Sequence, residues 1–274
     1  MNKKEIAQET LRIQQQGCYE YEGRQVDIAA AQHHSEHNSH LITPEQGAAL
    51  VADCQLLSKS QQAAVYSVAN EATVKAIVDC KKAGGVRVGV LNFASAKNPG
   101  GGFLNGAMAQ EESLAASSGL YGTQLRNEGY YMANRACRSM MYTDHAIYSP
   151  DVVFFRDERF NLMKQPITAS VLTLPAVNYG QVLLKGEDLQ TAEHVMKDRM
   201  RLALAIFAHK GDKTLILGAY GCGVFRNDPE KVASWWHELL NDEGFGSLFS
   251  AITFAVLDTS KGGKCIRAFE SEFS

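Results

Sequence analysis

Residues 98–112 read Asn-Pro-Gly-Gly-Gly-Phe-Leu-Asn-Gly-Ala-Met-Ala-Gln-Glu-Glu, and the rest of the chain is organised around this stretch. Three consecutive glycines let backbone amides approach a ligand with no side chain in the way. A seven-residue spacer separates the glycines from Gln110 and from two carboxylates, Glu111 and Glu112. This order of residues is typical of a ligand-binding or catalytic site rather than of a linker.

The flanking sequence predicts a helix, a strand, a glycine loop and a second helix in succession. Residues 70–82 carry apolar side chains at helical spacing and end before a Gly-Gly pair. Residues 86–93 form an apolar, valine-rich run that predicts a buried strand leading directly into the glycines. Residues 106–120 are rich in Ala, Met, Leu, Gln and Glu, which predicts the second helix.

A second glycine loop, residues 218–225, reads Gly-Ala-Tyr-Gly-Cys-Gly-Val-Phe. It follows an apolar strand at 214–217 and precedes Asp228-Pro229, the expected cap and first turn of a helix through residue 240. Either loop alone is better explained as a tight turn, and neither contains the P-loop or the complete dinucleotide-binding motif. Together, two glycine loops that run into helix N-termini suit a diphosphate.

Glu111 and Glu112 are expected early in a helix, where neighbouring side chains point about 100° apart. We therefore expect one of them to face the centre of a ligand and the other its flank, unlike the opposed carboxylates of a standard glycosidase. A glutamate beside a glycine loop can act as general acid or base if burial raises its pKa. The alternative is that first-turn acids only complement the helix dipole.

Elsewhere the chain alternates between predicted strands and helices without a linker or an internal repeat. Strands are expected at 146–149, 152–155, 167–174 and 251–257, and helices at 188–209 and 261–269. This alternation predicts one α/β domain over residues 1–274, with residues 1–69 as an N-terminal extension packed on it. Ligands of open α/β sheets bind at the carboxyl ends of strands, where the loops 92–102, 175–180, 218–225 and 258–263 are expected to meet.

The N-terminal region predicts a helix at 2–16 that Gly17 stops, a short hairpin within 18–29 and a short helix from Thr43-Pro44 to 51. Between them His33, His34, His37 and His40 lie at spacings that let imidazoles of a helix share a metal ion. The intervening Ser and Asn residues favour a solvated loop, and no metal site or cofactor is expected.

The composition is that of an ordinary globular protein. The 274 residues are 45% hydrophobic and 21% charged, and the formal net charge is -3. This small net charge gives no strong electrostatic field that would favour sequence-specific nucleic-acid binding or attraction to a membrane surface. The six scattered cysteines suit a reducing compartment, and with no apolar leader the expectation is a cytoplasmic protein, although a translocated effector remains an alternative.

The spacing from Gly100-Gly101-Gly102 to Gln110-Glu111-Glu112 resembles the signature of the poly(ADP-ribose) glycohydrolases, a catalytic branch of the macrodomain superfamily. Residues 91–99, Leu-Asn-Phe-Ala-Ser-Ala-Lys-Asn-Pro, resemble the shorter bacterial branch. The likeness extends to residues 218–229 and to Glu9-Thr10-Leu11. It implies a macrodomain-like three-layer α/β/α fold with a mixed central sheet and an N-terminal helical extension.

The resemblance also implies a role for each motif residue. Asn98 is expected to contact the distal ribose, with Ser95 and Asn92 as alternatives, and Phe225 to lie against the adenosine half. Glu112 is expected to be the general acid and base, with Glu111 and Gln110 as its positioning partners. The diphosphate and distal ribose would be held by Gly100, Gly101 and Gly102 and by Gly221, Cys222, Gly223, Val224 and Phe225.

The leading hypothesis is therefore an exo-acting hydrolase of the ribose-ribose bond in poly(ADP-ribose) that releases ADP-ribose. Two alternatives remain open: a module that binds ADP-ribose without cleaving it, and a hydrolase that removes single ADP-ribose units from a protein or nucleic-acid acceptor. The intact Gln110-Glu111-Glu112 sequence argues against the binding module, because a binding module needs no catalytic acid.

Overall fold

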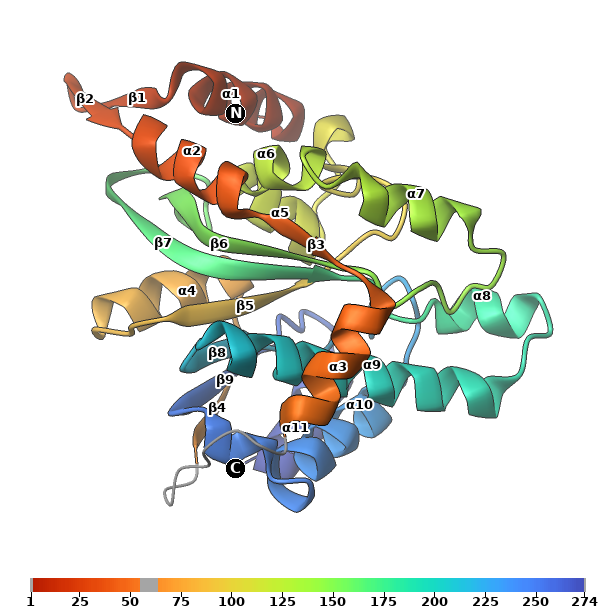
Figure 1. Cartoon of the computed structure of the whole chain (residues 1–274). Helices are drawn as coiled ribbons and strands as arrows, with labels where there is room; N and C mark the ends of the chain where they lie inside the picture. Colours follow the sequence, from red (N-terminus) through yellow and green to blue (C-terminus); the bar gives the residue numbers. More distant parts are fainter. Residues whose placement is uncertain (1, 55–63, 274) are drawn as a thin grey trace.

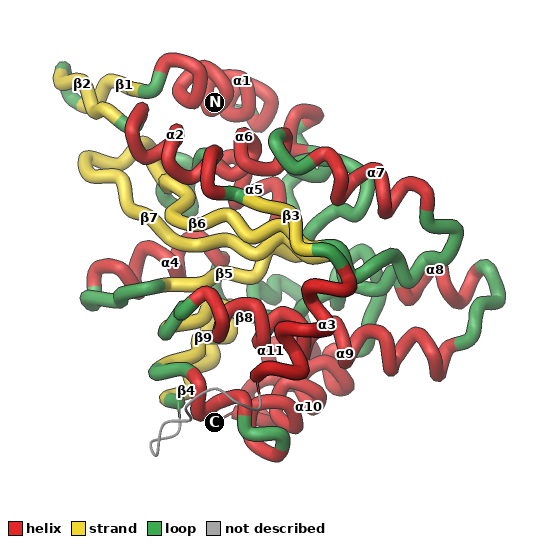
Figure 2. Tube along the Cα trace, viewed as in Figure 1, coloured by secondary structure: helices red, strands yellow, loops and turns green. Residues whose placement is uncertain are grey.

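A seven-stranded mixed sheet runs through the protein, with helices on both of its faces (Figure 1; Figure 2). The computed structural model describes residues 2–54 and 64–273. The strand order is β3 (His40–Ile42), β6 (Ala146–Arg156), β7 (Leu162–Leu174), β5 (Val88–Phe93), β8 (Thr214–Leu217), β9 (Ala251–Ala255) and β4 (Val65–Ala69). The pairs from β7 to β4 are parallel, whereas β3–β6 and β6–β7 are antiparallel. The predicted three-layer α/β/α fold with a mixed sheet is confirmed.

One face of the sheet is covered by α4 (Thr73–Lys82), α5 (Gln110–Ser117) and α6 (Leu120–Leu125). Val88 and Val90 of β5 point to this side and pack with Leu114 of α5 in one buried cluster. Since side chains alternate along a strand, Leu91, which follows Val90, belongs to the core on the opposite face.

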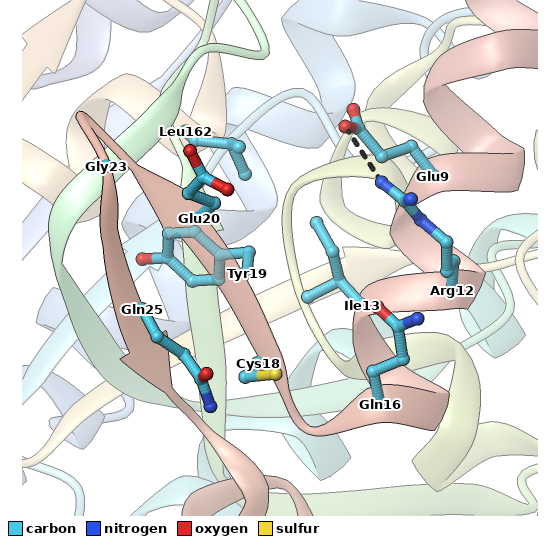
Figure 3. A pocket seen from close by; sticks show the side chains of 10 residues that line it. All are labelled: Glu9, Arg12, Ile13, Gln16, Cys18, Tyr19, Glu20, Gly23, Gln25 and Leu162. Atoms are coloured by element: carbon cyan, nitrogen blue, oxygen red, sulfur yellow. Dashed lines mark ion pairs between the residues drawn. The ribbon is translucent and has the colours of Figure 1, made fainter.

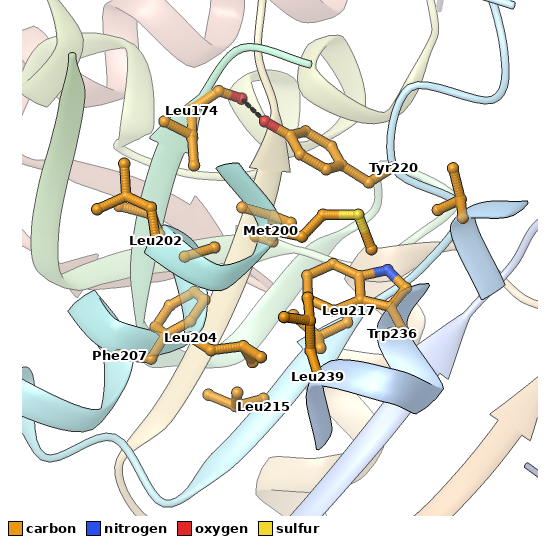
Figure 4. Packing of buried hydrophobic residues seen from close by; sticks show 14 of the residues in the cluster. Leu174, Met200, Leu202, Leu204, Phe207, Leu215, Leu217, Tyr220, Trp236 and Leu239 are labelled. Carbon is orange, nitrogen blue, oxygen red and sulfur yellow. Dashed lines mark hydrogen bonds between the residues drawn. The ribbon is translucent and has the colours of Figure 1, made fainter. Parts of the chain in front are cut away.

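The opposite face is covered by α3 (Pro44–Asp53), α9 (Leu189–Lys210), α10 (Pro229–His237) and α11 (Lys264–Phe273). Figure 4 shows Met200 of α9 and Trp236 of α10 packed over Leu217 of β8. The indole Nε1 of Trp236 donates to the Gly218 carbonyl at 3.3 Å, directly where the second glycine loop begins. The core on this face therefore also supports that loop.

The fold also contains several shorter elements. They are α7 (Glu128–Ala136), α8 (Tyr179–Leu184), the 3₁₀ turns η2 (Phe103–Asn105) and η4 (Phe245–Leu248), and the π-helical turn η3 (Glu238–Asp242).

The N-terminal helix α1 (Lys3–Gln16) ends at Gly17, whose φ of +68° is the left-handed conformation that glycine adopts freely. The hairpin of β1 (Cys18–Tyr21) and β2 (Arg24–Asp27) follows as predicted. The predicted helix after Thr43 is confirmed as α3, which Thr43 caps. The division of the chain at residue 69 stays a prediction; β3 and β4, both N-terminal to it, are strands of the main sheet.

Three predicted elements are wrong in form. The expected His-bearing loop is a helix, α2 (Ala29–Asn38), whose buried residues are the polar Gln32 and Ser35. The single helix expected over 106–120 is shorter: residues 106–109, after the η2 turn, are not helical, α5 covers only 110–117, and α6 begins at Leu120 after Ser118–Gly119. The two strands expected at 146–155 are one strand, β6, with a register shift after Ser149.

Candidate active site

A cavity of about 1000 Å³ opens at the carboxyl ends of the parallel strands. Its lining includes residues from the loops after β5, β7, β8 and β9, and from the turn between β4 and α4. The prediction that four loops leaving strands meet at one edge is confirmed. A volume of this size suits a ligand larger than a single sugar.

Glu112 lies at the wall of this cavity, in the third position of α5. The residue that precedes α5, Ala109, has no side chain that can cap the helix, and one oxygen of Glu112 accepts its N–H at 3.0 Å. The other oxygen, Oε1, accepts the N–H of Gly102 at 2.8 Å. Glu112 as a residue is 9% exposed and lines the cavity, so a ligand can reach the carboxyl group that the two backbone amides hold.

Glu111 is more deeply buried, at 3% exposed, and its carboxyl group accepts three hydrogen bonds. Oε1 accepts from Asn92 Nδ2 at 3.2 Å and from Gln124 Nε2 at 2.9 Å. Oε2 accepts from the backbone N–H of Ser95 at 2.7 Å. Burial raises the pKa of Glu111 to about 8, because the charged form loses its hydration, and the three donors oppose this only in part.

Both carboxyl groups lie against Gly101. A Cβ placed on this glycine would be 2.4 Å from Glu112 Oε1 and 3.0 Å from Glu111 Oε2. The expectation that the two acids diverge by about 100° is therefore wrong for their carboxyl ends, because Glu111 and Glu112 both bend towards the glycine loop. Gly101 also has a φ of +58°, so this position requires glycine for two reasons.

Gln110 connects α5 to strand β5. Its Oε1 accepts the N–H of Phe93 at 2.9 Å, and its Nε2 donates to the carbonyl of Leu91 at 2.8 Å. The side chain thus continues the hydrogen bonding of the strand and fixes where the helix begins, which suits the positioning role expected for it.

The first glycine loop uses its amides within the protein. Gly100 donates to Gln124 Oε1 at 2.8 Å, Gly101 to the Asn98 carbonyl at 3.0 Å and Gly102 to Glu112 Oε1 at 2.8 Å. The expectation that this loop presents free amides to a phosphate is wrong in this structure. Its glycines instead let the backbone lie directly against the two acids; Gly101 and Gly102 line the cavity, whereas Gly100 does not.

The second glycine loop has the opposite character. Within the described residues, the N–H groups of Gly221, Gly223, Val224 and Phe225 donate to no protein acceptor. All four residues line the cavity together with Cys222, whose own N–H donates to the Ala219 carbonyl at 3.1 Å. This loop therefore offers a set of unused donors of the kind that holds phosphate oxygens.

Asn227 shapes this loop and was not identified from the sequence. Its Nδ2 donates to the carbonyls of Val177 at 2.8 Å and Gly221 at 3.0 Å, and it is 5% exposed. Phe225 lies at the loop's end with its ring 6.1 Å from that of Tyr142.

The three alternatives for a polar ribose contact lie in different places. Asn98 is exposed and lines the cavity. Ser95 is partly buried and also lines the cavity, and its Oγ accepts the N–H of Asn98 at 3.1 Å. Asn92 is fully buried behind Glu111 and does not line the cavity. The structure thus leaves Asn98 and Ser95 as the two candidates that a ligand can reach.

The histidines of α2 and β3 do not contribute to the cavity. His33 and His37 stack with ring centroids 3.7 Å apart, as residues four apart on one helix can. Over residues 2–54 and 64–273, no group of three or more His, Cys, Asp or Glu side chains is placed to hold a metal ion.

A second, smaller hollow of about 480 Å³ lies between α1 and the β1–β2 hairpin (Figure 3). Its wall includes Arg12, which pairs with Glu9 at 3.5 Å, and Tyr19, whose hydroxyl donates to the Met163 carbonyl at 2.6 Å. These polar groups already have partners within the protein.

In the described part of the chain, no helix is both long and apolar enough to cross a membrane.

Comparison with known proteins gives a consistent result. Residues 7–157 match the family described as "Microbial-type PARG, catalytic domain", where PARG stands for poly(ADP-ribose) glycohydrolase. The crystal structure of the Thermomonospora curvata glycohydrolase is similar over 99% of both chains, with 38% sequence identity and a TM-score of 0.95. The same enzyme bound to the inhibitor ADP-HPD gives 38% identity and a TM-score of 0.92, again over 99% of both chains.

The Deinococcus radiodurans glycohydrolase in complex with ADP-ribose matches 91% of this chain and 99% of its own, with 39% identity and a TM-score of 0.84. A search of curated protein sequences returned no match. The family match covers more than half of the chain, and the likeness in sequence and fold extends over nearly all of it. The chain therefore belongs to the microbial-type poly(ADP-ribose) glycohydrolases, hydrolases that act on poly(ADP-ribose).

Proposed function

We propose that this glycohydrolase cleaves the ribose-ribose O-glycosidic bond with Glu112 as general acid and then general base. The observation that carries this proposal is the position of Glu112, whose carboxyl group lies at the cavity wall and is held by the Gly102 and Ala109 amides. A carboxyl group fixed in this way can transfer a proton without first being reoriented.

The terminal ADP-ribose unit of the polymer occupies the cavity in this proposal. Its diphosphate accepts hydrogen bonds from the unused amides of the second glycine loop, those of Gly221, Gly223, Val224 and Phe225, and its adenine lies against the Phe225 ring. Asn98 and the Gly101–Gly102 backbone contact the distal ribose. Two observations support this arrangement: among the residues that the structure describes, the second glycine loop has N–H groups without a protein acceptor whereas the first does not, and a relative is described in complex with ADP-ribose.

The reaction then proceeds in two steps. In the first, the anomeric C–O bond breaks while protonated Glu112 donates its proton to the departing ribose oxygen, which leaves as a hydroxyl group. The ribose that remains has oxocarbenium character, and the nearby diphosphate stabilises its positive charge. In the second step the Glu112 carboxylate takes a proton from water as the water oxygen attacks the anomeric carbon, and Glu112 is again protonated.

Release of ADP-ribose from chain ends, rather than cleavage within the polymer, is the expected mode because the chain resembles the shorter bacterial branch. The partners would be poly(ADP-ribose) and ADP-ribosylated acceptors.

We further propose that residues 1–274 act as one catalytic domain with residues 1–69 as its extension. The six free thiols support a reducing, cytoplasmic location.

The deciding experiment compares wild type with Glu112→Gln on a protein acceptor that carries poly(ADP-ribose), with released ADP-ribose measured by chromatography. We expect the variant to lose about 10²- to 10⁴-fold in turnover, the usual contribution of general acid–base catalysis. ADP-ribose binding, measured by calorimetry, should persist. Release of ADP-ribose monomers from the start, without oligomers, would support exo action.

Glu128→Gln is the matched control, because Glu128 is an exposed acid in the first turn of α7 and lies outside the cavity. If first-turn acids served only the helix dipole, the two variants would behave alike. Full turnover by Glu112→Gln would refute the proposed mechanism. Binding of ADP-ribose by wild type without turnover on chains, or release from singly modified acceptors alone, would refute the polymer as substrate.

A further inference from the structure

Gln124 of α6 connects the first glycine loop to the buried acid of the site. Its side chain is fully buried and makes three hydrogen bonds. Oε1 accepts the N–H of Gly100 at 2.8 Å, and Nε2 donates to Glu111 Oε1 at 2.9 Å and to Thr173 Oγ1 at 3.4 Å. No sequence motif marks this residue, which lies outside both glycine loops and outside the Gln-Glu-Glu sequence.

The orientation of the Gln124 amide follows from chemistry. The backbone N–H of Gly100 can only donate, so the group that faces it must be the amide oxygen. The amide nitrogen then faces Glu111 and donates to it. One planar group thus fixes the backbone of the glycine loop and one oxygen of the acid at the same time.

This contact leaves the two oxygens of Glu111 in different surroundings. Oε1 accepts from two side-chain amides, Gln124 and Asn92, whereas Oε2 accepts only the Ser95 N–H and faces Gly101. Gln124 therefore holds the carboxyl group so that Oε2 is the oxygen turned towards the glycine loop and Glu112.

The titratable groups that face Glu111 are Glu112 on the same helix and Tyr130 and Tyr131 of α7. Burial holds the pKa of both tyrosines well above 10, so they stay neutral in the ordinary pH range. The groups that contact it from β5 and α6, Asn92 and Gln124, are uncharged amides. Loss of the Gln124 donor therefore removes one of the few interactions that stabilise ionised Glu111.

We infer that Gln124 is a positioning residue of the catalytic site. It holds the Glu111 carboxyl group and the Gly100–Gly102 backbone in fixed positions relative to Glu112. This inference rests on the function proposed above, since it assigns Gln124 a part in the same reaction. It is not a catalytic residue, because it does not line the cavity and acts only through Glu111 and the loop.

Two substitutions separate the two contacts. Gln124→Glu is nearly isosteric and keeps an acceptor for Gly100, but it replaces the donor to Glu111 with a second acid. Gln124→Met removes both contacts. We expect kcat to fall about tenfold in the Glu variant and further in the Met variant, because one or two hydrogen bonds to the site are lost. The KM for polymer should change less than about threefold, because the cavity lining stays in place.

The pH dependence of kcat distinguishes a positioning role from a structural one. Both substitutions weaken the stabilisation of ionised Glu111, so the limb of the profile that reports its ionisation should move by about one unit to higher pH. Gln32→Met is the control, since Gln32 is also a buried glutamine, donates to Glu36 and to the Gly119 carbonyl, and lies away from the cavity. This control should lower the melting temperature and leave the profile unchanged.

The outcome is separable from that of the proposed function. Full turnover by Glu112→Gln would refute the proposed mechanism, in which Glu112 is the general acid and base. If Glu112→Gln is inactive but both Gln124 variants keep the wild-type kcat and pH profile, only the present inference fails. It also fails if the profile stays fixed while kcat falls only in parallel with thermal stability, as in Gln32→Met. Should Gln124→Met not fold, the nearly isosteric Glu variant decides the question through the same profile.

Discussion

Oε1 of Glu112 and the backbone N–H of Gly102 lie 2.8 Å apart, so the proposed acid is joined to the glycine loop by a direct hydrogen bond. The same carboxyl group also accepts the N–H of Ala109 at the start of α5. The position of the acid therefore depends on the close approach of the loop, and in particular on the absence of a side chain at Gly101.

Gly101→Ala should abolish turnover. The new Cβ would lie 2.4 Å from Glu112 Oε1, and the carboxyl group would have to move. Gly186→Ala is the matched control, because Gly186 has a similar φ of +66° but no heavy atom within 4 Å of an added Cβ. Both variants should lose about 1 kcal/mol of stability to left-handed strain, and only Gly101→Ala should lose activity. Equal activity in a chain-release assay would contradict this explanation.

The stability of the wild-type protein should fall as the pH rises from about 4.5 to about 8. Burial raises the pKa of Glu111 to about 8 in the folded protein, from an ordinary value of 4.5. The folded state therefore holds a proton that the unfolded state has lost. This contribution is fully present below pH 4.5 and is lost as the pH rises through 8.

Glu111→Gln removes this titration. Free energies of unfolding measured from pH 4 to pH 9 should therefore fall more steeply for wild type than for the variant, by an amount on the order of a few kcal/mol at the alkaline end. Glu128→Gln, which replaces an exposed acid, should follow the wild-type curve. Parallel curves for wild type and Glu111→Gln would show that Glu111 ionises normally.

Phe225→Ala should weaken ADP-ribose binding by about tenfold to a hundredfold, the usual contribution of a base that stacks on an aromatic ring. Turnover at saturating polymer should be nearly unchanged, since the ring is assigned to the adenosine half and lies away from the reacting bond. Calorimetry with ADP-ribose measures the effect. Val224→Ala is the control, as Val224 is 84% exposed in the same loop. Equal affinities of the two variants would remove Phe225 from the site.

Met200→Ala should lower the free energy of unfolding by about 2–5 kcal/mol, because this fully buried side chain fills the core between α9 and the sheet. Met132→Ala should change it by less than about 0.5 kcal/mol, since Met132 is 59% exposed on α7. Denaturant unfolding of both variants tests the difference. A small loss at Met200 would mean that the core closes around the missing side chain.

The sequence predicted most accurately those elements whose buried face is apolar. The helix expected at 188–209 matches α9 within one residue at each end, and the strand expected at 214–217 matches β8. Helix α2 was missed because its buried residues, Gln32 and Ser35, are polar. Gln32 fits there because Gly119 has no side chain and its carbonyl accepts from Gln32 Nε2, a contact made across 87 residues of sequence.

The site was predicted in part for a similar reason. The two glycine loops and the acid pair are local patterns, and the fold brings them to one cavity. The difference between the loops was not predictable, because it depends on which amides are already used by distant partners. Gln124 takes the Gly100 amide and Asn227 shapes the second loop, and neither residue belongs to a glycine loop or to the acid motif.

Strand β4, at one edge of the sheet, is paired with β9 there, although the ribosome makes β4 long before β9. Until β9 emerges, Val65–Ala69 has no strand beside it in this sheet, and the turn into α4, whose Thr73 lines the cavity, lacks the two hydrogen bonds that Asn70 makes with the backbone of Asp258 after β9. Long-range parallel pairing of this kind forms late. A growing chain is thus expected to be inactive until its last strand is made, so that polymer cleavage begins only with a nearly finished protein.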